Sequence, residues 1–235
     1  MKKQLLGLSV LVAFLSTSAL AAGPVANIQV TGDIKPPTCT VNGATQSDVI
    51  FDLGKISPSL IPQSQNYKYP TNITKNTVTV ECDANTYLTF NAIDTYGDTP
   101  LDVGTTTKGD GIFHLVDNDN ITTSVGGILF VWATPTVDGN PAYISRANDV
   151  PLSFTGDSAV LAKQVTNGWT ATQQTSVDKN ELDLIAGKVF STTFKQGNSS
   201  SAFILSRDSL NEKQIDITNG LDFIGEAVLA FSFGV

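Results

Sequence analysis

Short runs of alternating apolar and polar residues occupy much of this chain, and that two-residue period limits the folds open to it. The clearest run closes the sequence, where Ala227, Leu229, Phe231, Phe233 and Val235 hold every second position. Side chains two positions apart in a β-strand lie on the same face, so this run predicts a strand with one apolar face. Runs rich in Val, Ile, Thr and Phe recur between Gly, Pro, Asn and Asp, without the 3.6-residue period of a long helix. The sequence therefore predicts an all-β, antiparallel sandwich.

The first alternating run spans residues 28–34 and is followed by a bend at Pro36-Pro37. We expect it to be the first strand of the fold. Further strands are expected at residues 39–41, 49–54, 77–82 and 87–93, which places the longest insertions in the middle of the chain.

The N-terminus has the pattern of a secretory signal peptide. Lys2 and Lys3 precede an apolar stretch from Leu5 to Leu15, and Ala19-Leu20-Ala21 is a small-x-small cleavage site. The stretch is about half the length of a membrane span, and we expect no membrane insertion. The sequence predicts a signal peptide over residues 1–21, one domain over 22–235, and export to the periplasm or the cell surface.

Cys39 and Cys82 are the only cysteines, and each shares a predicted strand face with valines. Two cysteines in an oxidising compartment most often form one disulfide. Neither a CxxC motif nor a zinc-type spacing is present. We expect a structural bridge that joins the strand of Cys39 to the strand of Cys82.

The formal charge is −8, and removal of Lys2 and Lys3 with the signal makes the mature chain still more acidic. An acidic chain without a basic run offers no electrostatic footprint for nucleic acid. Nucleic acid is therefore not an expected partner.

The residues give little support to an enzyme. His114 is the single histidine and lies within an apolar run, where it is most often structural. No Gly-x-Ser-x-Gly elbow or phosphate-binding loop is present. Residues 117–120, Asp-Asn-Asp-Asn, lack the glycine and distal glutamate of an EF-hand and are more typical of a solvated turn. We expect no catalytic residues, metal or cofactor.

Trp132 and Trp169 are the two candidates for ligand contact, because an exposed indole can stack on a sugar ring. Core packing is favoured for both, more clearly for Trp132, which ends a buried run, than for Trp169 in a polar region.

Two parts of the chain resemble chaperone–usher pilins. Residues 26–34 followed by Cys39-Thr40-Val41, the Phe51-Asp52-Leu53-Gly54-Lys55-Ile56 turn and Val78-Thr79-Val80-Glu81-Cys82 resemble their opening strands. The closing alternating run is similar to their last strand. Within that group the chain looks most like the GltF-like family of exported proteins, and the resemblance covers residues 26–93 and 220–235.

The resemblance implies an incomplete immunoglobulin-like fold that lacks its seventh strand. In pilins a periplasmic chaperone lends this strand, and a neighbouring subunit later replaces it. The implied partners are thus a pilus chaperone, an usher and neighbouring fimbrial subunits. Carried over to this chain, Cys39 and Cys82 match the bridging pair. Residues 227, 229, 231, 233 and 235 match the strand that contacts the chaperone or the donor strand.

The chain departs from pilins at two points. Its penultimate residue is Gly234, where pilins usually have an aromatic residue. Only residues 22–25 precede the first predicted strand, so we expect a subunit that accepts a donated strand but cannot supply one, as a terminal or non-polymerising subunit would. The extra central length could instead complete the fold from within. A free-standing periplasmic β-sandwich that binds a small ligand or sugar is the alternative function.

Overall fold

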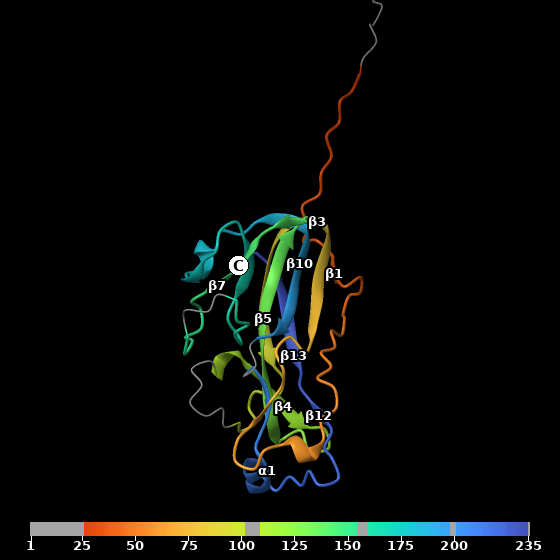
Figure 1. Cartoon of the computed structure of the whole chain (residues 1–235). Helices are drawn as coiled ribbons and strands as arrows, with labels where there is room; N and C mark the ends of the chain where they lie inside the picture. The colour runs from red at the N-terminus through yellow and green to blue at the C-terminus, as the bar shows by residue number, and fades with distance from the viewer. Residues whose placement is uncertain (1–25, 102–108, 155–158, 198–200, 235) are drawn as a thin grey trace, which may run out of the picture. The chain divides into compact units, whose positions relative to one another are not determined.

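The computed structural model describes residues 26–101, 109–154, 159–197 and 201–234 (Figure 1). The chain divides into two units at Lys35 and Pro36. The predicted signal peptide and Val235 lie outside the described residues.

The described part of the first unit, residues 26–35, contains no strand. Ile28, Val30 and Ile34 are 93%, 91% and 104% exposed. The prediction of a first strand over residues 28–34 is therefore wrong. Alternation makes a segment suitable for a sheet, but a strand also needs a hydrogen-bonding partner, and none is found for this segment among the described residues of its unit.

The second unit is all-β, as predicted, with one short α-helix. Its strands are β1 (Cys39–Val41), β2 (Tyr67–Lys68), β3 (Lys75–Asp94), β4 (Ile112–Asp117), β5 (Ser124–Val137), β6 (Asn140–Pro141), β7 (Tyr143–Ala147), β8 (Asn167–Thr170), β9 (Thr175–Val177), β10 (Ala186–Gln196), β11 (Ala202–Ile204), β12 (Phe223–Ile224) and β13 (Ala227–Phe233). The helix is α1 (Arg207–Glu212), and 3₁₀ turns occur at η1 (Pro58–Leu60), η2 (Gly109–Gly111) and η3 (Lys179–Glu181).

The main strand order is β12-β4-β5-β10-β3-β8-β7-β9, and β1 and β13 also pair with β3. In Figure 1, β10 runs between β5 and β3, and it pairs with both. All pairs are antiparallel except β7 with β9. Both flanking strands of β10 are therefore long, and this central part of the sheet carries much of the backbone pairing.

Strand β3 unites two runs that the sequence predicts as separate strands. Its first part pairs with β10 and β1, and its last part pairs with β13 and β8. Val78 and Val80 are buried in the first part, and Leu88, Phe90 and Ala92 are buried in the second. The two apolar runs thus belong to one strand that changes its pairing partners along its length.

The predicted disulfide is present. Cys39 and Cys82 are bonded, with an S–S distance of 2.02 Å, and they are also direct partners in the register of β1 and β3. The bridge therefore fixes the short strand β1 to the long strand β3 at the point where they pair.

A tight turn at Asp138 and Gly139 joins β5 to β6. Asp138 and Gly139 both have positive φ, 49° and 77°, the conformation that a two-residue hairpin turn of this type requires. Asp138 also accepts hydrogen bonds from the backbone N–H groups of Lys188 and Val189, so the turn is held against β10.

Among the described residues, no helix has both the length and the apolar character needed to cross a membrane.

Candidate functional site

The C-terminal strand β13 pairs along one flank only. All seven of its residues are in register with β3, from Ala227 opposite Asp94 to Phe233 opposite Leu88. Within the described part of the chain, no strand pairs with its other flank. β13 is therefore an open edge, and open edges can accept a further strand.

The ladder shows which backbone groups of β13 lie on the open flank. The hydrogen bonds from Thr95 N to Glu226 O (3.0 Å) and from Gly234 N to Tyr87 O (2.9 Å) join residues directly opposite each other. In an antiparallel pair, hydrogen-bonded and non-bonded positions alternate. The even-numbered residues of β13 therefore bond to β3. The odd-numbered residues, Ala227 to Phe233, direct their N–H and C=O groups to the open flank.

The side chains on β13 are also only half covered. Ala227, Leu229 and Phe231 pack against the core but are partly exposed, and Phe233 is 47% exposed. Their partners on β3 are buried: Leu88, Phe90 and Ala92 are 1%, 2% and 0% exposed. Because both strands belong to the same sheet, the difference reflects the missing neighbour of β13 and leaves apolar surface in water.

The ends of β13 are anchored to β3 even though its flank is open. The ring centroids of Phe231 and Phe90 are 5.9 Å apart. The hydroxyl of Thr89 donates to the backbone oxygen of Gly234 at 2.6 Å. The strand is therefore held in place as a fixed edge. The structure brings together residues 227, 229, 231 and 233 of the predicted contact set, and residue 235 lies outside the described range.

The two tryptophans proposed as ligand contacts both lie in the core. Trp132 on β5 is 6% exposed and Trp169 on β8 is 2% exposed. The indole N–H of Trp169 donates to Ser191 O at 3.3 Å, and its ring packs on Phe90 and Phe190. Neither indole presents an exposed ring face for stacking on a sugar.

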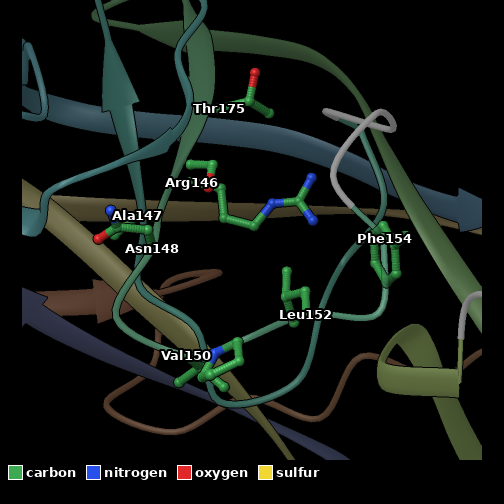
Figure 2. Close-up of a pocket in the computed structure, with 9 residues that line it drawn as sticks. Arg146, Ala147, Asn148, Val150, Leu152, Phe154 and Thr175 are labelled. Carbon is green, nitrogen blue, oxygen red and sulfur yellow. The ribbon is translucent and has the colours of Figure 1, made fainter.

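A cavity of about 170 Å³ lies between β7, β9 and the loop after β7. Figure 2 shows the Arg146 side chain extending across it towards Phe154, and the guanidinium carbon lies 5.2 Å from the centroid of that ring. Arg146 is 2% exposed. Val150, Leu152 and Thr175 also line the cavity. The cavity thus combines a buried cation stacked on an aromatic ring with apolar and hydroxyl-bearing walls, groups that could contact a small ligand.

This cavity was not predicted from the sequence. Its wall combines residues 146–154 with residues 175–176, which are brought together by the parallel pairing of β7 and β9. The sequence carries no alternating pattern over residues 143–147 that would have marked Arg146 as buried.

His114 lies in a buried polar cluster at the end of β3. Its Nδ1 is 3.0 Å from the Thr99 hydroxyl, which in turn bonds to Tyr96 O and Ser124. Asp94 accepts from the backbone N–H of His114 at 3.1 Å and pairs with Lys163 at 3.5 Å. Burial is the main cause that lowers the pKa of His114. Because Asp94 binds the backbone and not the ring, this geometry differs from a Ser-His-Asp relay.

The acidic turn at residues 117–120 is held by its own backbone. Asp117 accepts from the N–H of Asp119 at 2.9 Å, and the turn borders an open hollow with Asp216 and Asp222. A hydrogen bond from Thr218 lowers the pKa of the exposed Asp216. No three His, Cys, Asp or Glu side chains of the described ranges are grouped so as to hold a metal ion.

Neither the family models nor the curated proteins that were searched contain a match to this chain.

Proposed function

We propose that this chain is an exported fimbria-related structural or adhesion subunit that assembles by strand complementation at β13. A periplasmic chaperone would occupy the open flank first, and a neighbouring subunit would replace it during assembly at an usher. One observation carries the proposal. Residues 227–233 have unpaired backbone groups and half-covered apolar side chains on the same flank of β13. Strand addition satisfies both at once.

The resemblance to chaperone–usher pilins supports the same proposal. It covers the strand of Cys39, the strand of Cys82 and the closing strand, and these three pair with one another in the fold through β3. The finer fold that we propose is an immunoglobulin-like, pilin-type sandwich with central insertions. In that fold the absent strand would lie beside β13.

The position of β1 changes the proposed role in a fibre. Because the first strand begins at Cys39, residues 26–35 precede the fold and are not part of it. They alternate Ile28, Val30, Gly32 and Ile34 with polar residues, and ten residues exceed the seven of β13. This removes the reason for restricting the chain to a terminal position. We infer that each copy both accepts a strand at β13 and supplies one from residues 26–35.

Self-assembly of the mature chain tests the proposal. Purified residues 22–235 should form dimers and longer chains as concentration and incubation time increase, measured by analytical ultracentrifugation. Val30→Asp should prevent assembly, because it places a charge on the apolar face of the donor segment.

The matched control is Gln29→Asp, which adds the same charge one position away, on the opposite face. It should assemble like the unchanged chain. A chain that stays monomeric at high concentration, or equal behaviour of the two variants, would contradict the proposal.

The second candidate is a free-standing periplasmic module that binds a small ligand or sugar. The cavity lined by Arg146 and Phe154 favours it, and the strand-complementation test would then give a monomer. The chaperone–usher proposal ranks first because the open flank of β13 is continuous over the whole strand, whereas the cavity is small and its cation is already stacked on an aromatic ring.

A further inference from the structure

We propose that His114, Asp94 and Lys163 form an acid-sensitive latch at the start of β13, which holds the C-terminal strand closed near neutral pH and loosens when His114 takes up a proton.

The C-terminal chain changes its pairing partner next to this cluster. β12 pairs with β4 through Ile224 and Val116, and β13 pairs with β3 from Ala227 onwards. Gly225 lies between them, and a Cβ built there would be 2.9 Å from His114 O and 2.6 Å from a methyl carbon of Leu115. The crossing point is therefore packed against the backbone of His114 so closely that glycine is required.

The turn after β3 connects the imidazole to the C-terminal strand. Thr99 contacts the His114 ring, and its backbone N–H bonds to Tyr96 O. At the start of the same turn, the N–H of Thr95 bonds to Glu226 O, next to the pair of Asp94 with Ala227. Movement of this turn would therefore break the hydrogen bond that begins the β13 ladder.

Burial favours a neutral imidazole, whereas the hydrogen bond at Nδ1 fits either protonation state. The hydroxyl hydrogen of Thr99 is directed to Tyr96 O at 2.7 Å, so its oxygen accepts from His114, and this assigns the ring hydrogen to Nδ1. A proton added at Nε2 would put a positive charge in a buried site. Burial is the principal cause of the lowered pKa of His114, and the charge of Lys163 also lowers it.

The charges around the imidazole come from three elements. Asp94 belongs to β3 and raises the pKa of His114, while Lys163 belongs to the segment before β8 and lowers it. Backbone oxygens of the turn, at Tyr96 and Thr99, raise it. On β5 the polar neighbour is the uncharged Ser124, linked through Thr99. On the overlying C-terminal chain, Glu226 is exposed. Among the described residues of this cluster, Asp94 is thus the one buried carboxylate, and it already forms an ion pair with Lys163.

The sign of the effect follows from the direction of the shift. The folded pKa is below the ordinary value of about 6.5, so an opened state with a solvated imidazole binds a proton more strongly than the closed state. The latch is fully effective above about pH 6.5. As the pH falls from about 6.5 to the pKa of His114 in the folded state, the equilibrium constant for closing the latch decreases by up to about tenfold per pH unit.

The single histidine makes the experiment specific. Its imidazole pKa can be read from the one histidine ring signal in NMR, and protection against hydrogen exchange can be followed for the Thr95 and Val228 amides between pH 5 and 8. Protection at both amides should fall below pH 6.5, up to tenfold per unit and without dependence on urea, because the opening is local. Amides at the centre of β10 should exchange only by a urea-dependent opening.

His114→Asn is the variant of choice, because its side-chain amide keeps a donor near Thr99 but does not titrate. It should give protection at Thr95 and Val228 that is constant across this pH range. Lys163→Met removes the neighbouring cation and should raise the pKa of His114. If His114→Asn does not fold, the pH series of the unchanged chain decides by itself.

A folded pKa at or above 6.5 would overturn the latch, and so would protection that is independent of pH or depends on urea. The effect of the latch on partner docking rests on the proposed function, but its readout needs no partner. A negative result here would leave strand complementation standing, while failure of the assembly test would leave the latch intact.

Discussion

At the scale of single residues, Tyr69 shows how strongly burial controls a polar group. The side chain is 1% exposed, and its hydroxyl has no hydrogen-bond partner among the described residues. Burial, with a smaller contribution from Tyr67, raises its pKa to about 12. The folded state therefore favours the neutral phenol, and no hydrogen bond among the described residues offsets the burial of its hydroxyl group.

This predicts an alkaline loss of stability that one substitution removes. Below pH 10 the phenol is neutral in both the folded and the unfolded chain. Between pH 10 and 12 only the unfolded chain ionises, so the free energy of unfolding should fall by about 1.4 kcal/mol per pH unit. Tyr69→Phe should abolish this loss and leave stability at pH 7 unchanged or up to about 1 kcal/mol higher. Urea denaturation at pH 7 and pH 11 measures both.

Tyr67→Phe is the matched control, because Tyr67 is only partly buried and its ring centroid lies 5.2 Å from that of Tyr69. It should retain most of the alkaline loss. An equal loss in Tyr69→Phe and in the unchanged chain would show that another group is responsible.

At the scale of elements, β13 has two backbone flanks with different roles, and proline can separate them. Ala227 directs its N–H to the open flank, whereas Ala230 bonds to Asn91 of β3. Proline removes the N–H in either case. Ala227→Pro should keep stability within about 1 kcal/mol, since edge positions accept proline, and should weaken chain–chain assembly. Ala230→Pro should cost about 1–3 kcal/mol, because it leaves a backbone oxygen of β3 unpaired.

The two variants start from the same residue type on the same strand, so differences in side-chain size do not enter. Urea denaturation and sedimentation on each variant are sufficient. If Ala227→Pro destabilised the fold as much as Ala230→Pro, the assignment of flanks would be incorrect.

A regular alternating pattern did not guarantee a strand, because the strands expected at residues 28–34 and 49–54 are both absent from the described fold. The strands that were missed lack the pattern. Ala227–Phe233 and residues 77–82 alternate clearly and lie in strands. Residues 28–34 alternate equally well and are not, because alternation reports a segment suited to pairing and carries no information about a partner. Pro36-Pro37, which cannot donate to a ladder, was the local sign that the segment is separate from β1.

Strand β8 and helix α1 escaped prediction for other reasons. All four residues of β8, Asn-Gly-Trp-Thr, are buried, so no polar face alternates with an apolar one. Helix α1 has six residues, too few for a 3.6-residue period to be recognised. It begins with a Ser206 cap whose hydroxyl accepts from Ser209 N.

At the scale of the whole molecule, long-range pairing decides what the sequence could not. That residues 77–82 and 87–93 form one strand with different partners at its two ends depends on β10, β1, β13 and β8 together. The Arg146 cavity likewise depends on β9 lying parallel to β7. The open flank of β13 was expected from the resemblance to pilins. Which residues of β13 direct their backbone groups to that flank could be assigned only from the observed register with β3.

The disulfide is the one covalent link that acts on this scale, and its removal should be costly without rearranging the sheet. The bridge joins residues 43 apart in sequence, and closing a loop of this length in the unfolded chain corresponds to about 4 kcal/mol of stabilisation. β1 has three residues and pairs only with β3 among the described strands, so little else holds it in place.

Guanidinium denaturation with and without a reducing agent measures this contribution, and the double variant Cys39→Ser with Cys82→Ser should match the reduced chain. If reduction lowered the free energy of unfolding by less than about 1 kcal/mol, the prediction would be wrong, and residual contacts between these segments in the unfolded chain would be the explanation. The bridge fastens β1 to β3, the same strand with which β13 pairs. Reduction should therefore weaken assembly at β13 as well as stability, and a reduced chain that still assembles normally would show that strand complementation does not depend on the bridge.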